Sequence, residues 1–171
     1  AGVALPVYCV QEPELPLLLS KSTNLFKLFL SDVGLLASMY VDGLQLKILS
    51  REKDINFGAI YENVAAQELK AHGFELYYFN SKKQGELDFV IEYKGNVLPL
   101  EIKSGKAYTR HNALDNVLKE ERYAIPQAFV FCNKNISTQE KIAYLPIYMI
   151  GFLEKEKIEE YIYSIDLSAL Q

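Results

Sequence analysis

The stretch from Gly85 to Gly105, GELDFVIEYKGNVLPLEIKSG, restricts the fold more than any other part of the chain. Apolar and polar residues alternate in both of its halves, as they do in β-strands with one buried face. The Lys94-Gly95 pair between the halves suits a tight turn, because glycine adopts a positive φ without strain. We therefore predict a β-hairpin closed by a two-residue loop, with Phe89 opposite Leu100.

The register of this hairpin is restricted by its apolar residues. A slip of one residue would place every apolar side chain opposite a polar one, whereas a slip of two would keep the faces and change only the partners. In the predicted register one face is apolar, and it is formed by Leu87, Phe89, Ile91, Leu98, Leu100 and Ile102. The residues between them then share the opposite, polar face.

The polar face brings two carboxylates together. Asp88 lies opposite Glu101, and Glu86 lies opposite Lys103, in the predicted register. The Cβ atoms of such a pair are roughly 4.5–5.5 Å apart, and like charges at that distance are destabilising. Solvent, a raised pKa or a bound cation would offset the repulsion, and a divalent ion held by oxygen ligands is the simplest use of the pair. With Lys103 on the same face to meet a phosphate or a water, the pattern outlines a site that cleaves phosphodiesters.

A second interpretation of the same residues is structural. An exposed hairpin carries charges on its outer face without any function, and Glu86 and Lys103 would then form a cross-strand ion pair worth under ~1 kcal/mol. The functional interpretation is supported by Glu62, which shares a face with small and apolar residues of a predicted helix over 57–72. A carboxylate on such a face is seldom merely solvated, and it either pairs with a lysine or takes part in a site.

The rest of the chain alternates between helical and strand patterns. The expected helices are 33–40 with Asp32 as its cap, 57–72 ended by Gly73, and 152–163, and a loop and a helix are expected over 107–123. The expected strands are 7–10, 24–30, 74–79, 127–132 and 142–150, the last broken or bent at Pro146, with a loop over 133–140. The order from residue 57 onward predicts a mixed central sheet flanked by helices, in the α/β or α+β class.

Composition narrows the class of protein. The chain has 171 residues, enough for one domain or one domain with an appendage, and half of them are hydrophobic. A net charge of −4 and an isoelectric point near 5.3 exclude a surface that is basic throughout, so nucleic acid would need a local basic patch. Cys9 and Cys132 lack a metal-binding spacing and suit reduced core thiols. Without a long apolar run or a signal peptide, we expect a cytoplasmic protein with no membrane segment.

The N-terminal part is expected to be an appendage. Residues 1–20 are short apolar stretches broken by prolines, which suits the tail of a preceding module or a strand laid on the main domain. The chain begins with Ala1 instead of methionine, which suits a piece of a longer protein. We place the boundary between residues 1–50 and residues 51–171.

Several phrases of the sequence together resemble a known family. They are FKL at 26–28, DVGLL at 32–36, GAIYEN at 58–63, GELDFV at 85–90 and EIKSG at 101–105. The chain is similar to the PD-(D/E)xK, or restriction-endonuclease-like, superfamily, whose core has the order αβββαβ. Within that superfamily it resembles the nuclease-like C-terminal domain, of unknown function, of bacterial and archaeal AAA-type ATPases. The similarity spans nearly the whole chain, although Leu87 stands where the superfamily motif usually has proline.

The resemblance implies a metal-dependent nuclease that acts on DNA. Asp88 and Glu101 would bind Mg²⁺ or Mn²⁺, helped by the Ile102 carbonyl and by Glu62 through water. Lys103 would orient the attacking water or neutralise the scissile phosphate. A phosphate-binding rim would come from four basic residues that flank the hairpin, Lys82, Lys83, Lys106 and Arg110.

The resemblance also implies a partner, the ATPase module of the same full-length protein. The chain itself has no GxxxxGK[ST] sequence, and so no ATPase site of that kind. Two other functions stay open. The domain would bind nucleic acid or regulate the ATPase without cleaving, which the acidic isoelectric point favours, or it would only hold subunits of a homo-oligomer together.

Overall fold

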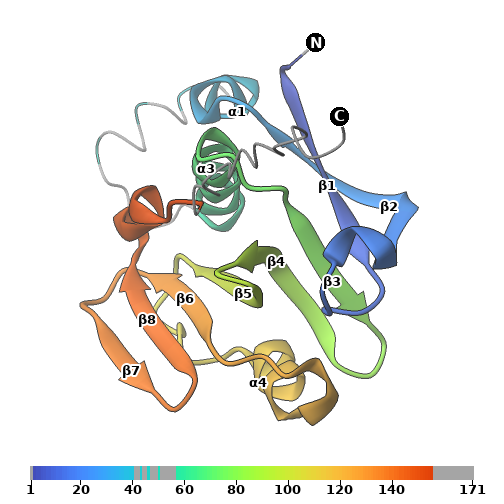
Figure 1. The fold of residues 1–171 in the computed structure, drawn as a ribbon. Helices are drawn as coiled ribbons and strands as arrows, with labels where there is room; N and C mark the ends of the chain where they lie inside the picture. Colours follow the sequence, from blue (N-terminus) through green and yellow to red (C-terminus); the bar gives the residue numbers. More distant parts are fainter. Residues whose placement is uncertain (1, 41–42, 44–45, 47–49, 51–56, 156–171) are drawn as a thin grey trace, which may run out of the picture.

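The computed structural model describes residues 2–40, 43, 46, 50 and 57–155. Its strands form one mixed sheet in the order β2-β1-β3-β4-β5-β6-β8-β7, with helices packed on it (Figure 1). The strands are β1 (Ala4–Val10), β2 (Lys21–Leu30), β3 (Tyr77–Ser81), β4 (Gly85–Tyr93), β5 (Asn96–Lys103), β6 (Ala128–Cys132), β7 (Ser137–Gln139) and β8 (Ile142–Pro146). The helices are α1 (Val33–Met39), α3 (Gly58–Ala71) and α4 (Asn112–Lys119), with the short 3-10 helices η1 (Leu17–Ser20), η2 (Glu121–Tyr123) and η3 (Ile147–Phe152). The predicted class, a mixed sheet flanked by helices, is confirmed.

Helices α3 and α4 cover opposite faces of the sheet (Figure 1). On one face, the small residues Ala65 and Ala66 of α3 let the helix pack closely with residues such as Leu100. On the other face, Leu114 of α4 packs with Val130. Six consecutive residues of β5, 97–102, are buried as a result. The prediction that the hairpin has a single apolar face is therefore wrong, because helices cover the sheet on both sides.

The predicted register of the central hairpin is confirmed. Strands β4 and β5 pair antiparallel with Phe89 opposite Leu100. The loop between them has a φ of 50° at Lys94 and 70° at Gly95. Positive φ at both central residues gives the turn a twist that matches the twist of the strands, and glycine at the second position adopts it without strain. The two-residue turn at Lys94-Gly95 therefore sets the register of the two strands that carry the candidate site.

The N-terminal strands belong to the same sheet as the hairpin. Strand β1 pairs parallel with β3, with Tyr8 opposite Tyr77, and β2 pairs antiparallel with β1 at the end of the sheet. Of the two expectations for residues 1–20, a strand laid on the main domain is the one that the structure bears out. The boundary drawn at residue 50 lies after these two strands, and it stays a prediction.

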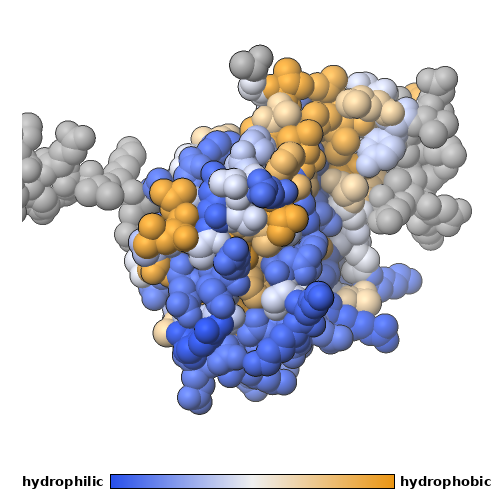
Figure 2. All heavy atoms as spheres, turned by 90° about the vertical axis from the view of Figure 1, so that its right-hand side faces the viewer, coloured by the Kyte–Doolittle hydropathy of each residue, from blue (hydrophilic) through white to orange (hydrophobic). Residues whose placement is uncertain are grey.

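Large apolar side chains of β2 are exposed, among them Leu25, Phe26 and Leu28. Figure 2 shows hydrophobic residues gathered over the upper part of this face, on the side of β1, β2 and α1, with hydrophilic residues below. Contiguous exposed apolar surface is a common feature of sites where another protein binds. The lower, hydrophilic part of this face is better suited to a polar ligand than the upper, hydrophobic part.

Local signals explain where the helices begin and end. The Asp32 carboxylate accepts a hydrogen bond from the Leu35 amide at 2.9 Å, so the predicted cap of α1 is confirmed. Helix α3 stops before Gly73, whose φ of 82° is one that glycine adopts without strain. Within the described ranges, none of the helices combines the length and the hydropathy needed to cross a bilayer.

The C-terminal strands differ from the prediction in two places. Residues 133–140, expected to be a loop, contain β7, which pairs antiparallel with β8. The strand predicted over 142–150 ends at Pro146, after which the chain turns into η3. Of the two outcomes predicted at Pro146, a break and a bend, the structure has the break, because proline has no backbone N–H to donate and a fixed φ.

Other elements also differ from their predicted bounds or lie partly outside the described residues. The strand predicted over 74–79 begins at Tyr77 and runs to Ser81. The loop and helix predicted over 107–123 are found as a loop that leads into α4, which is followed by η2. The helix predicted over 152–163 lies mostly outside the described residues, and only its first positions fall in η3 and the residues after it.

Candidate active site

A β-bulge in β4 positions Asp88. The pairing of β3 with β4 shifts by one residue between the pairs Tyr77–Val90 and Phe79–Leu87, so two residues of β4, Asp88 and its neighbour, stand against one of β3. The bulge turns Leu87 into the cluster under α4, whereas the sequence pattern placed it on the face toward α3. Bulges bend a strand and redirect its side chains, and they are common next to active sites.

Asp88 and Glu101 meet at the end of the hairpin, although not as a regular ladder pair. The regular pairs of β4 and β5 stop at Phe89 and Leu100. Beyond them, Asp88 Oδ2 accepts a hydrogen bond from the backbone N–H of Ile102 at 2.8 Å. Burial, followed by the neighbouring Asp88 carboxylate, raises the pKa of Glu101 to about 7. With only 2% of Glu101 exposed, the interpretation of these carboxylates as the outer face of an exposed hairpin is wrong.

Lys103 provides the positive charge at this carboxylate pair. Its Nζ lies 2.7 Å from Glu101 Oε2, and 26% of its side chain is exposed. Burial alone would lower the pKa of the Lys103 ammonium, but the charges of Glu101, Asp88 and Glu62 outweigh it, and the pKa is raised. Lys103 therefore carries a proton and a positive charge at neutral pH, with part of the side chain open to a ligand.

Helix α3 brings Glu62 to the same site from the other side. The side chain is half-buried, and burial is the main reason that its pKa is raised. The Asp88 carboxylate raises the pKa of Glu62 further, while Lys27 and Lys103 lower it. The four residues predicted as catalytic are therefore close enough to act on one another electrostatically.

Lys27 of β2 belongs to this cluster and was missed in the sequence. It forms an ion pair with Glu86 at 2.5 Å, and Asn80 donates a further hydrogen bond to Glu86 at 2.7 Å. The predicted pair between Glu86 and Lys103 is thus wrong, because Glu86 is held by residues of β2 and β3. The available signal was a single lysine in the apolar run NLFKLFL, with its side chain only 24% exposed in the structure.

The four predicted phosphate-binding residues lie on two loops. Lys82 and Lys83 are in the turn between β3 and β4, and Lys106 and Arg110 are in the loop between β5 and α4. All four are exposed, and Lys83 forms a loose ion pair with Glu120 at 3.5 Å. Whether they bind phosphate stays a prediction.

The carboxylate oxygens of Asp88 and Glu101 are suitable ligands for a hard divalent cation. Mg²⁺ is usually bound through one or two carboxylates, with water completing the coordination. Asp88 and Glu101 supply that number of carboxylates, and the pKa of Glu101 is raised mainly by burial and then by the Asp88 carboxylate, despite the nearby charge of Lys103. Within the described ranges, no three His, Cys, Asp or Glu side chains are arranged to hold an ion together. The remaining ligand positions would be taken by water, and a role for the Ile102 carbonyl or Glu62 stays a prediction.

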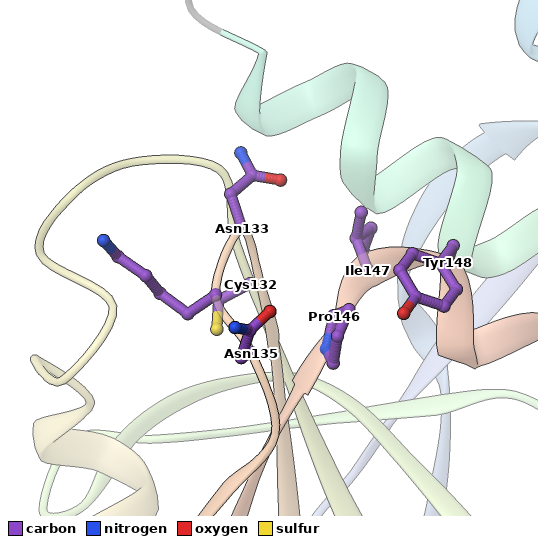
Figure 3. Close-up of a pocket in the computed structure, with 7 residues that line it drawn as sticks. Cys132, Asn133, Asn135, Pro146, Ile147 and Tyr148 are labelled. Carbon is purple, nitrogen blue, oxygen red and sulfur yellow. The ribbon is translucent and has the colours of Figure 1, made fainter.

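A pocket of about 420 Å³ lies beside these residues, at the ends of β6 and β8 (Figure 3). Asn133, at the end of β6, lines it and was missed in the sequence. Its Nδ2 donates to the Ser104 carbonyl at 3.2 Å, and its side-chain amide meets the Tyr61 hydroxyl at 3.3–3.4 Å. Ser104 follows Lys103 and Tyr61 precedes Glu62, so Asn133 joins the pocket to both sides of the candidate site.

The comparison with protein families identifies the chain at a coarse level. Residues 57–150, more than half of the chain, match a family described as a domain of unknown function, DUF4143. The chain belongs to the DUF4143 family. This match covers α3, the hairpin and the strands after it, and thus Glu62, Asp88, Glu101 and Lys103, but not Lys27 of β2. No curated protein and no solved structure matches the chain.

Proposed function

We propose that this DUF4143 domain is a metal-dependent nuclease of the PD-(D/E)xK type that acts on DNA phosphodiesters. The observation that carries the proposal is the convergence of Asp88, Glu101 and Lys103 at one end of a buried hairpin, with Glu62 brought to them by α3. The element order α3-β3-β4-β5-α4-β6 agrees with the αβββαβ order of that superfamily. An ATPase module in the same protein and a cytoplasmic location stay predictions.

The chemistry assigned to the site follows from its charges. A bound divalent ion would lower the pKa of a water and stabilise the charge that develops on the phosphate. Asp88 and Glu101 would hold that ion, and the hydrogen bond from the Ile102 amide keeps the Asp88 carboxylate in place. Lys103, protonated and partly exposed, would bind a non-bridging oxygen of the scissile phosphate or orient the water. Glu62, with its raised pKa, would reach the same water network from α3.

The net charge of −4 favours a second candidate, a module that binds or regulates without cleaving. Nucleases contact many phosphates, and an acidic protein has to do so through local basic groups. Against this candidate stands the cost of keeping the buried Glu101 carboxylate beside the partly buried Asp88 carboxylate. The exposed lysines of the turn between β3 and β4 would suit either a nuclease or a module that binds without cleaving.

The deciding experiment is thermal unfolding with increasing Mg²⁺ or Mn²⁺, with wild type beside Asp88→Ala. An ion that binds only the native state stabilises it by about 2.7 kcal/mol at a hundredfold excess over Kd, so the melting temperature of wild type should rise by several degrees. The variant should show no rise. If neither protein responds to metal, the nuclease assignment is wrong and the non-cleaving module is favoured. A positive result is followed by cleavage assays on labelled DNA in the same two proteins.

A further inference from the structure

We propose that the pocket at the ends of β6 and β8 binds one unpaired nucleotide next to the scissile phosphate, so that the substrate of this domain is single-stranded DNA. The part about the scissile phosphate rests on the proposed nuclease function. The part about nucleotide binding rests on the pocket itself, and the experiment below separates the two.

The first argument is location. Strands β5, β6 and β8 run parallel, and ligands of parallel sheets bind beyond the carboxyl ends of the strands. Lys103 at the end of β5 is the direct partner of Cys132 at the end of β6, and neighbouring strands lie about 4.8 Å apart. Cys132 lines the pocket. A chain whose phosphate meets Lys103 therefore has its next nucleotide at the mouth of this pocket.

The second argument is the rigid connection through Asn133. One end of its amide is fixed on the Ser104 carbonyl, and the Tyr61 hydroxyl of α3 holds the other part. These contacts fix the wall of the pocket relative to the strand that carries Lys103 and to the helix that carries Glu62. A pocket held in this way keeps a constant distance from the candidate catalytic groups.

The third argument is the chemistry of the lining. Figure 3 shows Ile147 and Tyr148 on one wall, across from Cys132, Asn133 and Asn135. The lining also includes Lys134 and contains no acidic residue, in a chain whose net charge is −4. An asparagine amide such as that of Asn135 can form paired hydrogen bonds with a base edge, lysine binds phosphate, and aromatic rings stack on bases of any sequence.

The fourth argument is size. The volume of about 420 Å³ falls in the range of roughly 300–1,000 Å³ that is typical of small-molecule sites, which suits one nucleotide and not a duplex. Tyr148 is 70% exposed, and its ring is therefore available for stacking. A base inside a duplex is already stacked and paired, and an aromatic side chain reaches its face only after it is unpaired. The preferred ligand is therefore a single strand or a frayed end.

The test measures DNA binding without cleavage. The fluorescence anisotropy of a labelled oligonucleotide is followed in EDTA, as a single strand and as the duplex of the same sequence, with the complete 171-residue chain. The variants are Tyr148→Ala and, as a matched control, Phe152→Ala, because Phe152 lies on the same element η3, is 73% exposed and does not line the pocket. Asp88→Asn is measured beside them as a change in the candidate site.

We expect the single strand to bind at least tenfold more tightly than the duplex. Tyr148→Ala should weaken single-strand binding by roughly 5- to 150-fold, the range expected for one stacked base, and Phe152→Ala should leave it unchanged. Equal affinity for both forms of DNA, or equal effects of the two aromatic substitutions, would overturn the inference even if the protein cleaves DNA. Binding that depends on Tyr148 without any metal-dependent cleavage would support the pocket as a nucleotide site and refute only the nuclease function.

Discussion

Replacing Glu101 with glutamine tests the electrostatics of the candidate site in one step. The pKa of Glu101 is raised from its ordinary value of 4.5 to about 7, mainly by burial and then by Asp88. At about 1.4 kcal/mol for each pH unit, this rise corresponds to about 3 kcal/mol. The rise already includes the attraction of Lys103, so it corresponds to the net cost of ionising this carboxyl group in the folded protein.

The sign of the effect follows from proton linkage. Below pH 4.5 the group is protonated in both the folded and the unfolded chain, and it makes no difference to stability. As the pH rises from 4.5 to 7, the unfolded chain loses the proton first, and the folded state loses up to about 3 kcal/mol of stability. Glutamine resembles the neutral form at every pH. In metal-free buffer Glu101→Gln should therefore be about as stable as wild type at pH 4 and up to about 3 kcal/mol more stable at pH 8.

The assay is urea unfolding in EDTA at pH 4, 6 and 8. Glu75→Gln is a matched control, because Glu75 also pairs with a lysine, at 2.8 Å from Lys70, but with 71% of its side chain exposed. That change should alter the free energy of unfolding by less than about 1 kcal/mol at each pH. Destabilisation by Glu101→Gln at pH 8, or a difference that does not vary with pH, would refute the assignment of Glu101 as a buried and uncompensated charge.

Three further changes test other parts of the structure. Lys103→Ala should retain the metal-dependent rise in melting temperature and lose at least about 100-fold in cleavage rate, since it removes a charge next to the phosphate; unchanged turnover would remove Lys103 from the mechanism. Mn²⁺ binding, measured by titration calorimetry, should be about tenfold weaker at pH 6 than at pH 8. The reason is that Glu101 has a pKa of about 7 and has to lose its proton to bind the metal. An equal Kd at both pH values would contradict this. Asn63→Ala should lower the free energy of unfolding, measured in urea, by about 1–3 kcal/mol. The reason is that the buried amide of Asn63 forms hydrogen bonds with both the N–H and the carbonyl of Leu30, at 2.8 and 2.9 Å. A change within about 0.5 kcal/mol, the usual scatter of surface substitutions, would show that water replaces these bonds.

The features that could be predicted from sequence are those set by short-range signals. The two-residue turn at Lys94-Gly95 aligns the hairpin, and that alignment by itself predicts that Asp88 lies near Glu101. Helical spacing placed Glu62 on the inner face of α3. In each case the signal and the residue that it positions lie on one element or on two adjacent strands.

The features that were missed depend on pairings between distant segments. The bulge at Asp88 arises from how β4 pairs with β3, which the alternation inside β4 does not record. Lys27 of β2 and Glu86 of β4 come together because β1 and β3 join their strands into one sheet. Asn133 acts through contacts with Ser104 and α3, and a lone asparagine after a strand has no sequence pattern that predicts them.

The parallel pairing of β1 with β3 has a consequence for the order of folding. It joins Tyr8 to Tyr77, about 70 positions apart, and a loop of that length has to close before the pairing gains any contact. The β4–β5 hairpin needs only a two-residue loop, and it carries Asp88, Glu101 and Lys103. The hairpin of the candidate site is therefore expected to form early, and the docking of β1 and β2, which delivers Lys27, is expected to complete the site late.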